Sequence, residues 1–367
     1  MAIRIVWAIE WFGINVMLLK RYIKKGWAGG TTMPVLVTGA AGFIGSHVVH
    51  LLLEKGFDVR ATARNPGQAQ FLEAFPKNKG AALEIVRMDL LEMGSVIDAV
   101  NGCDIVIHCA AALMVGVRDP QRDVIDPSVL GTTNLCQAIK KAGCVQTIIH
   151  TSSVAAIRST RHKNGHTFSS ADWCDDATLE SNPYGLAKAE AERVMRAFVR
   201  KQPDDKRPRL VTIHPSIVFG PVFQKRHTQG SMAYLKHFTG RMPFVLHTFL
   251  NYVDVRDVAN AHVSAINTGQ NNARYILHKE GIWMQEIGRR LRTFMPNKKW
   301  AVICLPKPAA ALLAIFHPKL TWRMVRSSLG RHLGYDVEGM EQELEIELRS
   351  SEQTLVDSIE SLLRLSV

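Results

Sequence analysis

Three side chains of this sequence have the types and the spacing needed to pass a proton to or from a carbonyl oxygen. Tyr184 and Lys188 lie four residues apart, so a helix over this segment places both on one face. A free phenol has a pKa of about 10, but a neighbouring ammonium and a positively charged cofactor would lower it. The hydroxyl of Ser153, or of Ser152 beside it, could donate to the substrate oxygen. We therefore predict Tyr184 as the proton donor, Lys188 as its electrostatic partner and Ser153 as the polarising group.

A glycine-rich turn far upstream of the tyrosine gives this set a context. The run Thr38 to Gly45 follows a short apolar segment that is typical of a buried strand. Gly39 permits a tight turn, Gly42 lets the backbone approach a pyrophosphate, and Gly45 lets the next helix pack closely. That helix, expected over 44–55, would aim its free N–H groups at the phosphates. The alternatives are a turn without a ligand and a Tyr–Lys surface pair, but the order of the motifs favours hydride transfer.

The second expected strand, 58–64, ends in Arg64 and not in an acidic residue. Enzymes that use NAD usually place an acid here for the ribose hydroxyls, whereas a guanidinium suits a 2′-phosphate. Arg60 points the same way along the strand but lies earlier, toward the body of the sheet. The sequence therefore predicts NADP as the preferred cofactor and leaves NAD open. The alternative is that Arg64 is a solvated surface charge.

Strand-like apolar runs alternate with helical patterns as far as about residue 265. This alternation predicts an α/β fold with a Rossmann-type doubly wound parallel sheet and a smaller C-terminal substrate lobe. We expect an apolar and basic segment over 1–32 and an NAD(P)-binding domain over 33–265, which includes part of the substrate lobe at about 220–250. Substrate-lobe and packing helices are expected over 266–367.

Together these runs resemble the extended short-chain dehydrogenase/reductase superfamily, of the NAD-dependent epimerase/dehydratase type. Within it, the sequence is most similar to the dihydroflavonol-reductase and 3β-hydroxysteroid-dehydrogenase branch. The likeness extends from about Val35 to Ala265, with a weaker tail beyond. Sugar-nucleotide epimerases of the superfamily usually carry Asn in the segment before Gly131-Thr132, where this chain has Asp126-Pro-Ser-Val129, closer to the reductases. The runs that carry the resemblance are 35–45, 59–64, 89–90, 182–188, 214–221 and 252–258.

The resemblance implies a role for individual residues of this chain. Arg64 would bind the 2′-phosphate, Asp89 and Leu90 would flank the adenine, and Pro215 would lie beside the nicotinamide. Ser153 matches the catalytic position of the family better than Ser152, because small residues follow it. The other residues assigned to the cofactor are the turn residues Gly39, Ala41, Gly42, Phe43, Ile44 and Gly45, the ribose-lining residues Cys109, Ala110 and Ala111, and Tyr184 and Lys188.

Composition limits the other classes of function. The net charge is +12, but the basic residues are spread out and form no nucleic-acid-binding motif, so we expect no nucleic-acid partner. The six cysteines have no metal-ligand or disulfide spacing. We therefore expect reduced thiols, a cytoplasmic location and no metal.

The first residues do not belong to the resemblance. The segment 3–19 is largely apolar and is followed by Lys20, Arg21, Lys24 and Lys25. Its length is close to the minimum for a membrane span, and the basic cluster would hold the domain at the cytoplasmic face. The alternatives are a helix packed on the domain and a true start of translation at Met33. Attachment to a membrane surface is thus left open.

The reaction that fits these features best is NADP-dependent interconversion of a ketone or aldehyde and an alcohol. Tyr184 would protonate the oxygen in one direction and act as the base in the other. The alternatives are epimerase or dehydratase chemistry on a nucleotide sugar and a dinucleotide-binding regulatory protein without turnover. The expected partner is a small-molecule carbonyl or alcohol substrate. The sequence does not decide the substrate's identity, and a homodimer is left open.

Overall fold

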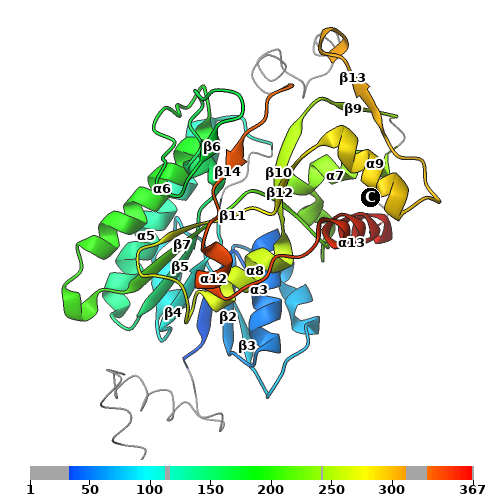
Figure 1. Cartoon of the computed structure of the whole chain (residues 1–367). Coiled ribbons are helices and arrows are strands. Elements are labelled where there is room, and N and C mark those ends of the chain that lie inside the picture. The colour runs from blue at the N-terminus through cyan, green and yellow to red at the C-terminus, as the bar shows by residue number, and fades with distance from the viewer. Residues whose placement is uncertain (1–32, 112–115, 241–242, 311–328, 366–367) are drawn as a thin grey trace, which may run out of the picture. The chain divides into compact units, whose positions relative to one another are not determined.

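The computed structural model describes residues 33–111, 116–240, 243–310 and 329–365 (Figure 1). Residues 34–367 form one compact unit. The segment 1–32, for which we predicted an anchor or a misassigned start, lies outside the described residues. In the part of the chain that the structure describes, no helix has the length and hydropathy needed to cross a membrane.

A sheet of seven parallel strands forms the centre of this unit, in the order β11-β7-β5-β4-β1-β2-β3. The chain runs outward from β1 to β3, then returns to the other side of β1 and runs outward again to β11. The sheet is therefore doubly wound, with its topological switch point between β1 and β4. This confirms the predicted fold class. The strands are β1 Val35–Thr38, β2 Val59–Ala63, β3 Leu83–Arg87, β4 Ile105–His108, β5 Thr147–Thr151, β7 Arg209–Pro215 and β11 Arg274–Leu277.

Helices cover both faces of the sheet because alternate strand residues are apolar on both sides. Leu36, Val106 and Ile148 pack against α4 (Met93–Val100), α5 (Asp126–Ala142) and α6 (Pro183–Arg200). The intervening residues Val37, Ile107 and Ile149 pack on the opposite face, against α3 (Phe43–Glu54) and α8 (Val255–Ser264). The predicted helix 44–55 corresponds to α3.

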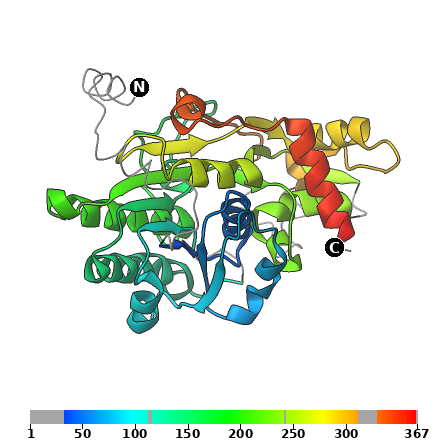
Figure 2. The same cartoon turned by 90° about the horizontal axis from the view of Figure 1, so that it is seen from below.

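A second core lies in the later part of the chain. It joins a three-stranded sheet to the helices α7, α9 and α13, and Figure 2 shows α13 beside the other two helices. Strand β11 comes after residue 265, so the central sheet takes one strand from the segment that we expected to serve the substrate lobe. The elements are β8 Ile217–Phe219, β10 Phe249–Asp254 and β12 Glu280–Trp283, the pairs β9 Phe244–Leu246 with β13 Ile303–Leu305 and β6 Thr167–Phe168 with β14 Gly334–Tyr335, and the helices α7 Ala233–Thr239, α9 Met284–Phe294, α12 Met340–Leu344 and α13 Ser351–Arg364.

Short helical turns join these elements at the carboxyl edge of the central sheet and around it. They are η1 Pro66–Gln68, η2 Gln70–Ala74, η3 Gln121–Ile125, η4 Val154–Ala156, η5 Asp204–Lys206, η6 Lys225–Thr228 and η7 Gly230–Met232.

Candidate active site

The glycine turn between β1 and α3 has the geometry that its residues require. Gly39 has a φ of +64°, and a Cβ there would lie 2.7 Å from Ala110 Cα. A Cβ on Gly45 would lie 2.3 Å from the carbonyl oxygen of Gly39. The Gly42 amide donates to the same oxygen at 2.9 Å, and Gly42 is the N-cap of α3. The turn is therefore a cradle that a side chain would fill, which fits a phosphate group at the start of a helix.

The ends of β1 and β4 are joined at the switch point by a buried hydrogen-bond chain. Thr38 Oγ1 accepts from the Ala110 amide at 3.1 Å and shares a second hydrogen bond with His108 Nδ1 at 2.7 Å. Burial lowers the pKa of His108 to about 3, and this keeps the imidazole neutral. The chain fixes the backbone of Cys109 and Ala110, two of the residues expected to line the cofactor ribose. Ala111, the third, is exposed.

The residues expected around the adenosine lie at the ends of β2 and β3. Arg64 is exposed and comes directly after β2. Arg60, by contrast, is engaged in the sheet body, where its Nε donates to Glu84 at 2.7 Å. Leu90 packs against Gly131, where a Cβ would lie 2.9 Å from its own Cβ. Of the two arginines, Arg64 is the one whose guanidinium has access to a ligand.

Asp89 is held by its neighbours in the same loop. Its carboxylate accepts from the Leu91 amide at 3.0 Å, and its amide donates to Ser95 Oγ at 3.0 Å. The carboxylate therefore fixes the loop that carries Leu90.

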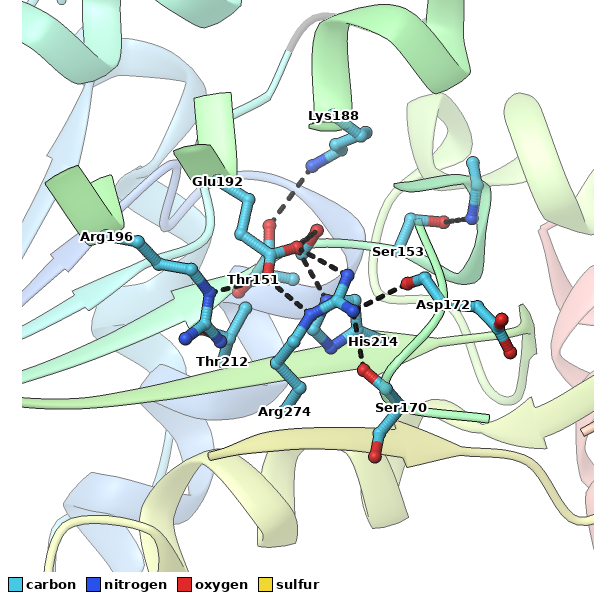
Figure 3. Close-up of polar contacts among 12 residues, drawn as sticks. Thr151, Ser153, Ser170, Asp172, Lys188, Glu192, Arg196, Thr212, His214 and Arg274 are labelled. Carbon is cyan, nitrogen blue, oxygen red and sulfur yellow. Dashed lines mark hydrogen bonds and ion pairs between the residues drawn. The ribbon is translucent and has the colours of Figure 1, made fainter. Parts of the chain in front are cut away.

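The structure brings the three predicted catalytic side chains together at the carboxyl edge of β5. Asn182 caps α6 by accepting from the Gly185 amide at 3.0 Å, so Tyr184 and Lys188 fall on its first two turns. Lys188 Nζ donates to the Thr151 carbonyl oxygen at 3.1 Å (Figure 3). The Ser153 hydroxyl, directly after β5, accepts from the Ala155 amide at 3.1 Å and acts on the Tyr184 phenol by lowering its pKa.

The electrostatics of the phenol differ from our expectation. Burial raises the pKa of Tyr184, and the hydrogen bond from Ser153 opposes this only in part. Burial also lowers the pKa of Lys188 to about 8, and its ammonium is directed at a backbone carbonyl. The groups of the protein alone therefore do not lower the phenol pKa, and burial is the dominant cause of its shift. The expected lowering also includes the positive charge of a bound cofactor.

The two serines after β5 have different partners, which separates their roles. Ser152 is only 3% exposed, and its hydroxyl donates to Glu192 Oε2 at 2.9 Å. Ser153 is partly exposed and contacts Tyr184. The proton of Ser152 is thus committed to the Glu192 carboxylate, and Ser153 as the polarising group stays a prediction.

Sequence reasoning missed a buried charged cluster beneath these residues. Glu192 is fully buried on α6 and pairs with His214 and with two arginines (Figure 3). Its only signal in the sequence is the spacing of four that continues from Tyr184 and Lys188. Pro215, expected beside the nicotinamide, is buried at the end of β7, directly after His214.

The glycine turn is also held by a segment that follows β8. His227 Nε2 donates to the Ala41 carbonyl at 3.0 Å, and His47 Nε2 donates to the Pro221 carbonyl at 2.9 Å. The rings of His227 and Phe43 lie 6.0 Å apart. No sequence motif predicts these contacts, because they join residues far apart in the sequence. Two of the predicted cofactor-binding residues, Ala41 and Phe43, therefore contact the segment that follows β8.

The described residues contain no group of His, Cys, Asp and Glu side chains arranged to hold a metal ion. The six cysteines are free thiols. The residues that could hold a dinucleotide are those of the glycine turn, where Gly42 is the N-cap of α3.

Comparison with known proteins gives the same assignment for most of the chain. A family model described as the NAD dependent epimerase/dehydratase family matches residues 35–277. A cinnamoyl-CoA reductase of Medicago truncatula is 34% identical over 272 residues, which cover 72% of this chain and 81% of that protein. A dihydroflavonol 4-reductase of Arabidopsis thaliana is 32% identical over 272 residues, covering 72% of this chain and 70% of that protein.

Among solved structures, the methylglyoxal/isovaleraldehyde reductase of yeast, in complex with NADPH, superimposes with a TM-score of 0.74. The two chains are 26% identical, and the match covers 91% of this chain and 99% of the yeast enzyme. The similarity therefore includes segments beyond the central sheet.

Proposed function

Because this chain belongs to the NAD dependent epimerase/dehydratase family, we propose that it is an NADP-dependent reductase that interconverts a small ketone or aldehyde and the alcohol. That it is an NAD(P)-dependent oxidoreductase of the extended short-chain type follows from its reductase relatives. The preference for NADP, the substrate class and the tyrosine mechanism are the proposal. The single observation that carries it is that Ser153, Tyr184 and Lys188 lie around the carboxyl end of β5, where Lys188 Nζ donates to the Thr151 carbonyl oxygen.

The cofactor would be held by the residues that already form a cradle. The amides at the start of α3 have no side-chain cap and would bind the pyrophosphate, and the lack of a Cβ at Gly39 and Gly45 lets the turn pack against Ala110 and against itself. Arg64 supplies an exposed guanidinium for a 2′-phosphate. When bound, the nicotinamide supplies the hydride for reduction and accepts it in the reverse direction.

The protein groups handle the proton and the charge on the oxygen. Ser153 donates a hydrogen bond where negative charge develops on the carbonyl oxygen. Tyr184 gives its phenolic proton to that oxygen, and its raised pKa keeps the phenol protonated until then. Lys188 is anchored on Thr151 and supplies the positive charge that stabilises the phenolate left behind.

The test is NADPH oxidation by the purified full chain with a panel of aliphatic and aromatic aldehydes and ketones, with Tyr184→Phe as the matched blank. We expect turnover with at least one carbonyl, and a loss of about a thousandfold or more in kcat for Tyr184→Phe. A cofactor that stays bound through purification without net oxidation by any carbonyl would contradict the proposal. Equal turnover by Tyr184→Phe would contradict the tyrosine mechanism.

Three statements about the setting of the protein stay predictions from the sequence. They are the cytoplasmic location, the attachment of the segment 1–32 to a membrane face, and a homodimer.

A further inference from the structure

One face of α6 carries a polar side chain at every fourth position. Tyr184, Lys188, Glu192 and Arg196 follow one another at this spacing, which places them in one row. The first two are the proposed proton donor and its partner. The third, Glu192, is fully buried in the side of α6 that faces the sheet, and the mechanism above gives it no part.

Glu192 is the centre of a cluster that joins four segments (Figure 3). Its Oε2 accepts from Ser152 Oγ at 2.9 Å and from His214 Nε2 at 2.7 Å. Its Oε1 accepts from Arg196 Nε at 2.9 Å and from Arg274 Nε at 2.7 Å. The carboxylate therefore has its acceptor sites filled by donors from α6, from the end of β5, and from β7 and β11.

Arg274 extends the cluster to the loop that leads into α6. Its Nη1 donates to the carbonyls of Ser170 at 2.5 Å and Asp172 at 2.7 Å. Its guanidinium also lies over the Trp173 ring at 3.9 Å. The loop before Tyr184 is thus tied to the same carboxylate as Ser152, the residue directly after β5. The segments that carry Ser153 and Tyr184 share one anchor.

Glu192 also lies one turn of α6 from Lys188, and both side chains are buried. Burial lowers the pKa of Lys188, and Cys109 and, to a smaller extent, Glu192 raise it. The other titratable groups that act on this amine are Cys109 and His108 from β4 and its end, and His150 from β5. Burial raises the pKa of Cys109 to about 11, so the thiol stays neutral. Burial lowers the pKa of both histidines well below neutrality, so they carry no charge either. Glu192 keeps a pKa well below its usual range because His214 and Arg274 outweigh its burial.

We propose that Glu192 is a positioning residue of the reductase: it holds the Ser152–Ser153 segment after β5 against α6 and places a negative charge one turn of the helix from Lys188. The positioning role of Glu192 in catalysis rests on the proposed function. The electrostatic effect of Glu192 on the Lys188 amine does not depend on that function. A buried ion pair contributes little net stability compared with apolar packing. Precise spacing of the reacting groups, in contrast, strongly affects the rate of the chemical step.

Two variants and one control separate this role from a general loss of stability. Glu192→Gln keeps the shape of the side chain and removes its charge. Ser152→Ala removes one arm of the cluster and leaves the carboxylate with its arginines, so it serves if Glu192→Gln fails to fold. Glu190→Gln, on the same helix but partly exposed and paired with Arg193, is the matched control.

The first readout is the split between kcat and KM, with the pH profile of kcat. For Glu192→Gln and Ser152→Ala we expect kcat to fall about tenfold or more while the KM for NADPH changes less than about threefold. For Glu192→Gln the alkaline limb of the profile moves to lower pH, because the ammonium loses its anion. Unchanged kcat, or equal effects in Glu190→Gln, would overturn the proposal.

The second readout needs no turnover. The protein is labelled with ¹³C-lysine, and the Cε signal of Lys188 is assigned as the one that is missing from the spectrum of Lys188→Arg. The chemical shift of this signal is then measured as a function of pH. We expect its midpoint to fall by about half a pH unit or more in Glu192→Gln and to stay in place in Glu190→Gln. An unchanged midpoint would refute the role of Glu192 whether or not the chain is a reductase. A lower midpoint in a chain that reduces no carbonyl would leave the charge role standing and remove only the proposed function.

Discussion

At the residue scale, the accessibility of a charge decides what it can do. Arg60 and Arg64 are four positions apart on one strand and its end, yet Arg60 is bonded to Glu84 and to backbone carbonyls while Arg64 is exposed. Strand alternation points both residues the same way, and only their positions along the strand distinguish them, since a residue at a strand end lies nearer the ligand edge. The binding of a 2′-phosphate by Arg64 stays a prediction.

We predict that Arg64→Ala weakens NADPH and leaves NADH almost unchanged. Loss of a charge-assisted hydrogen bond to a phosphate should raise the KM for NADPH by about ten- to a hundredfold. Steady-state kinetics with both cofactors measure this. Arg87→Ala, an exposed arginine paired with Glu92, is the control and should affect neither cofactor. Equal losses for NADPH and NADH would refute the assignment.

We also predict that kcat for reduction falls above about pH 8, since the pKa of Lys188 is about 8. Below that pH the amine is an ammonium and stabilises the developing phenolate; above it the charge is lost. The measurement is kcat at saturating substrate from pH 6 to 10. Lys188→Arg keeps the positive charge, so the activity that remains in this variant should not decrease above pH 8. A wild-type profile that is flat to pH 10 would contradict this account.

At the scale of elements, sequence patterns predicted the features that depend on residues close together in the chain. The glycine spacing predicted the β1–α3 turn, and the spacing of Tyr184 and Lys188 predicted the shared face of α6. The partners of Glu192 could not be foreseen, because Arg274 comes from a strand 82 residues later in the chain. Nothing in the residues around Glu192 encodes that distant approach. The same holds for His227 and its bond to Ala41.

The turn itself gives a prediction at this scale. Gly39→Ala should lower stability and abolish NADPH binding, because its Cβ would meet the Ala110 backbone at 2.7 Å in addition to the strain of a φ of +64°. Gly80→Ala has a similar φ of +75° with nothing within 4 Å. It should cost only about 1 to 2 kcal/mol of backbone strain. Thermal melts and cofactor-fluorescence titrations compare the two variants. NADPH binding by Gly39→Ala at wild-type affinity would rule out the cradle.

At the scale of the whole molecule, the doubly wound sheet was predictable because each strand is a short apolar run with its own turn signals. The extent of the later core was not. Strand β11 joins the central sheet from beyond residue 265, and its position depends on pairing with β7, where Tyr275 lies opposite Ile213. Such pairings are long-range, so periodicity within a segment cannot reveal them.

The final prediction concerns the buried histidines that lie in and around this sheet. His47, His108, His227 and His262 are each at most 5% exposed, and burial lowers their pKa values to between about 3 and about 4. Between these values and about 6.5 the unfolded chain binds more protons than the folded one, so the free energy of unfolding falls as the pH falls. Each histidine contributes about 1.4 kcal/mol per pH unit in this window. Four of them would offset a typical domain stability of about 10 kcal/mol within roughly two pH units.

Urea unfolding at pH 8, 7, 6 and 5 should therefore show a free energy of unfolding that is constant above pH 7 and drops steeply below it. Acid unfolding should be complete before Glu192 is protonated. A stability that stays level down to pH 5 would mean that these imidazoles are charged or solvated in the folded chain.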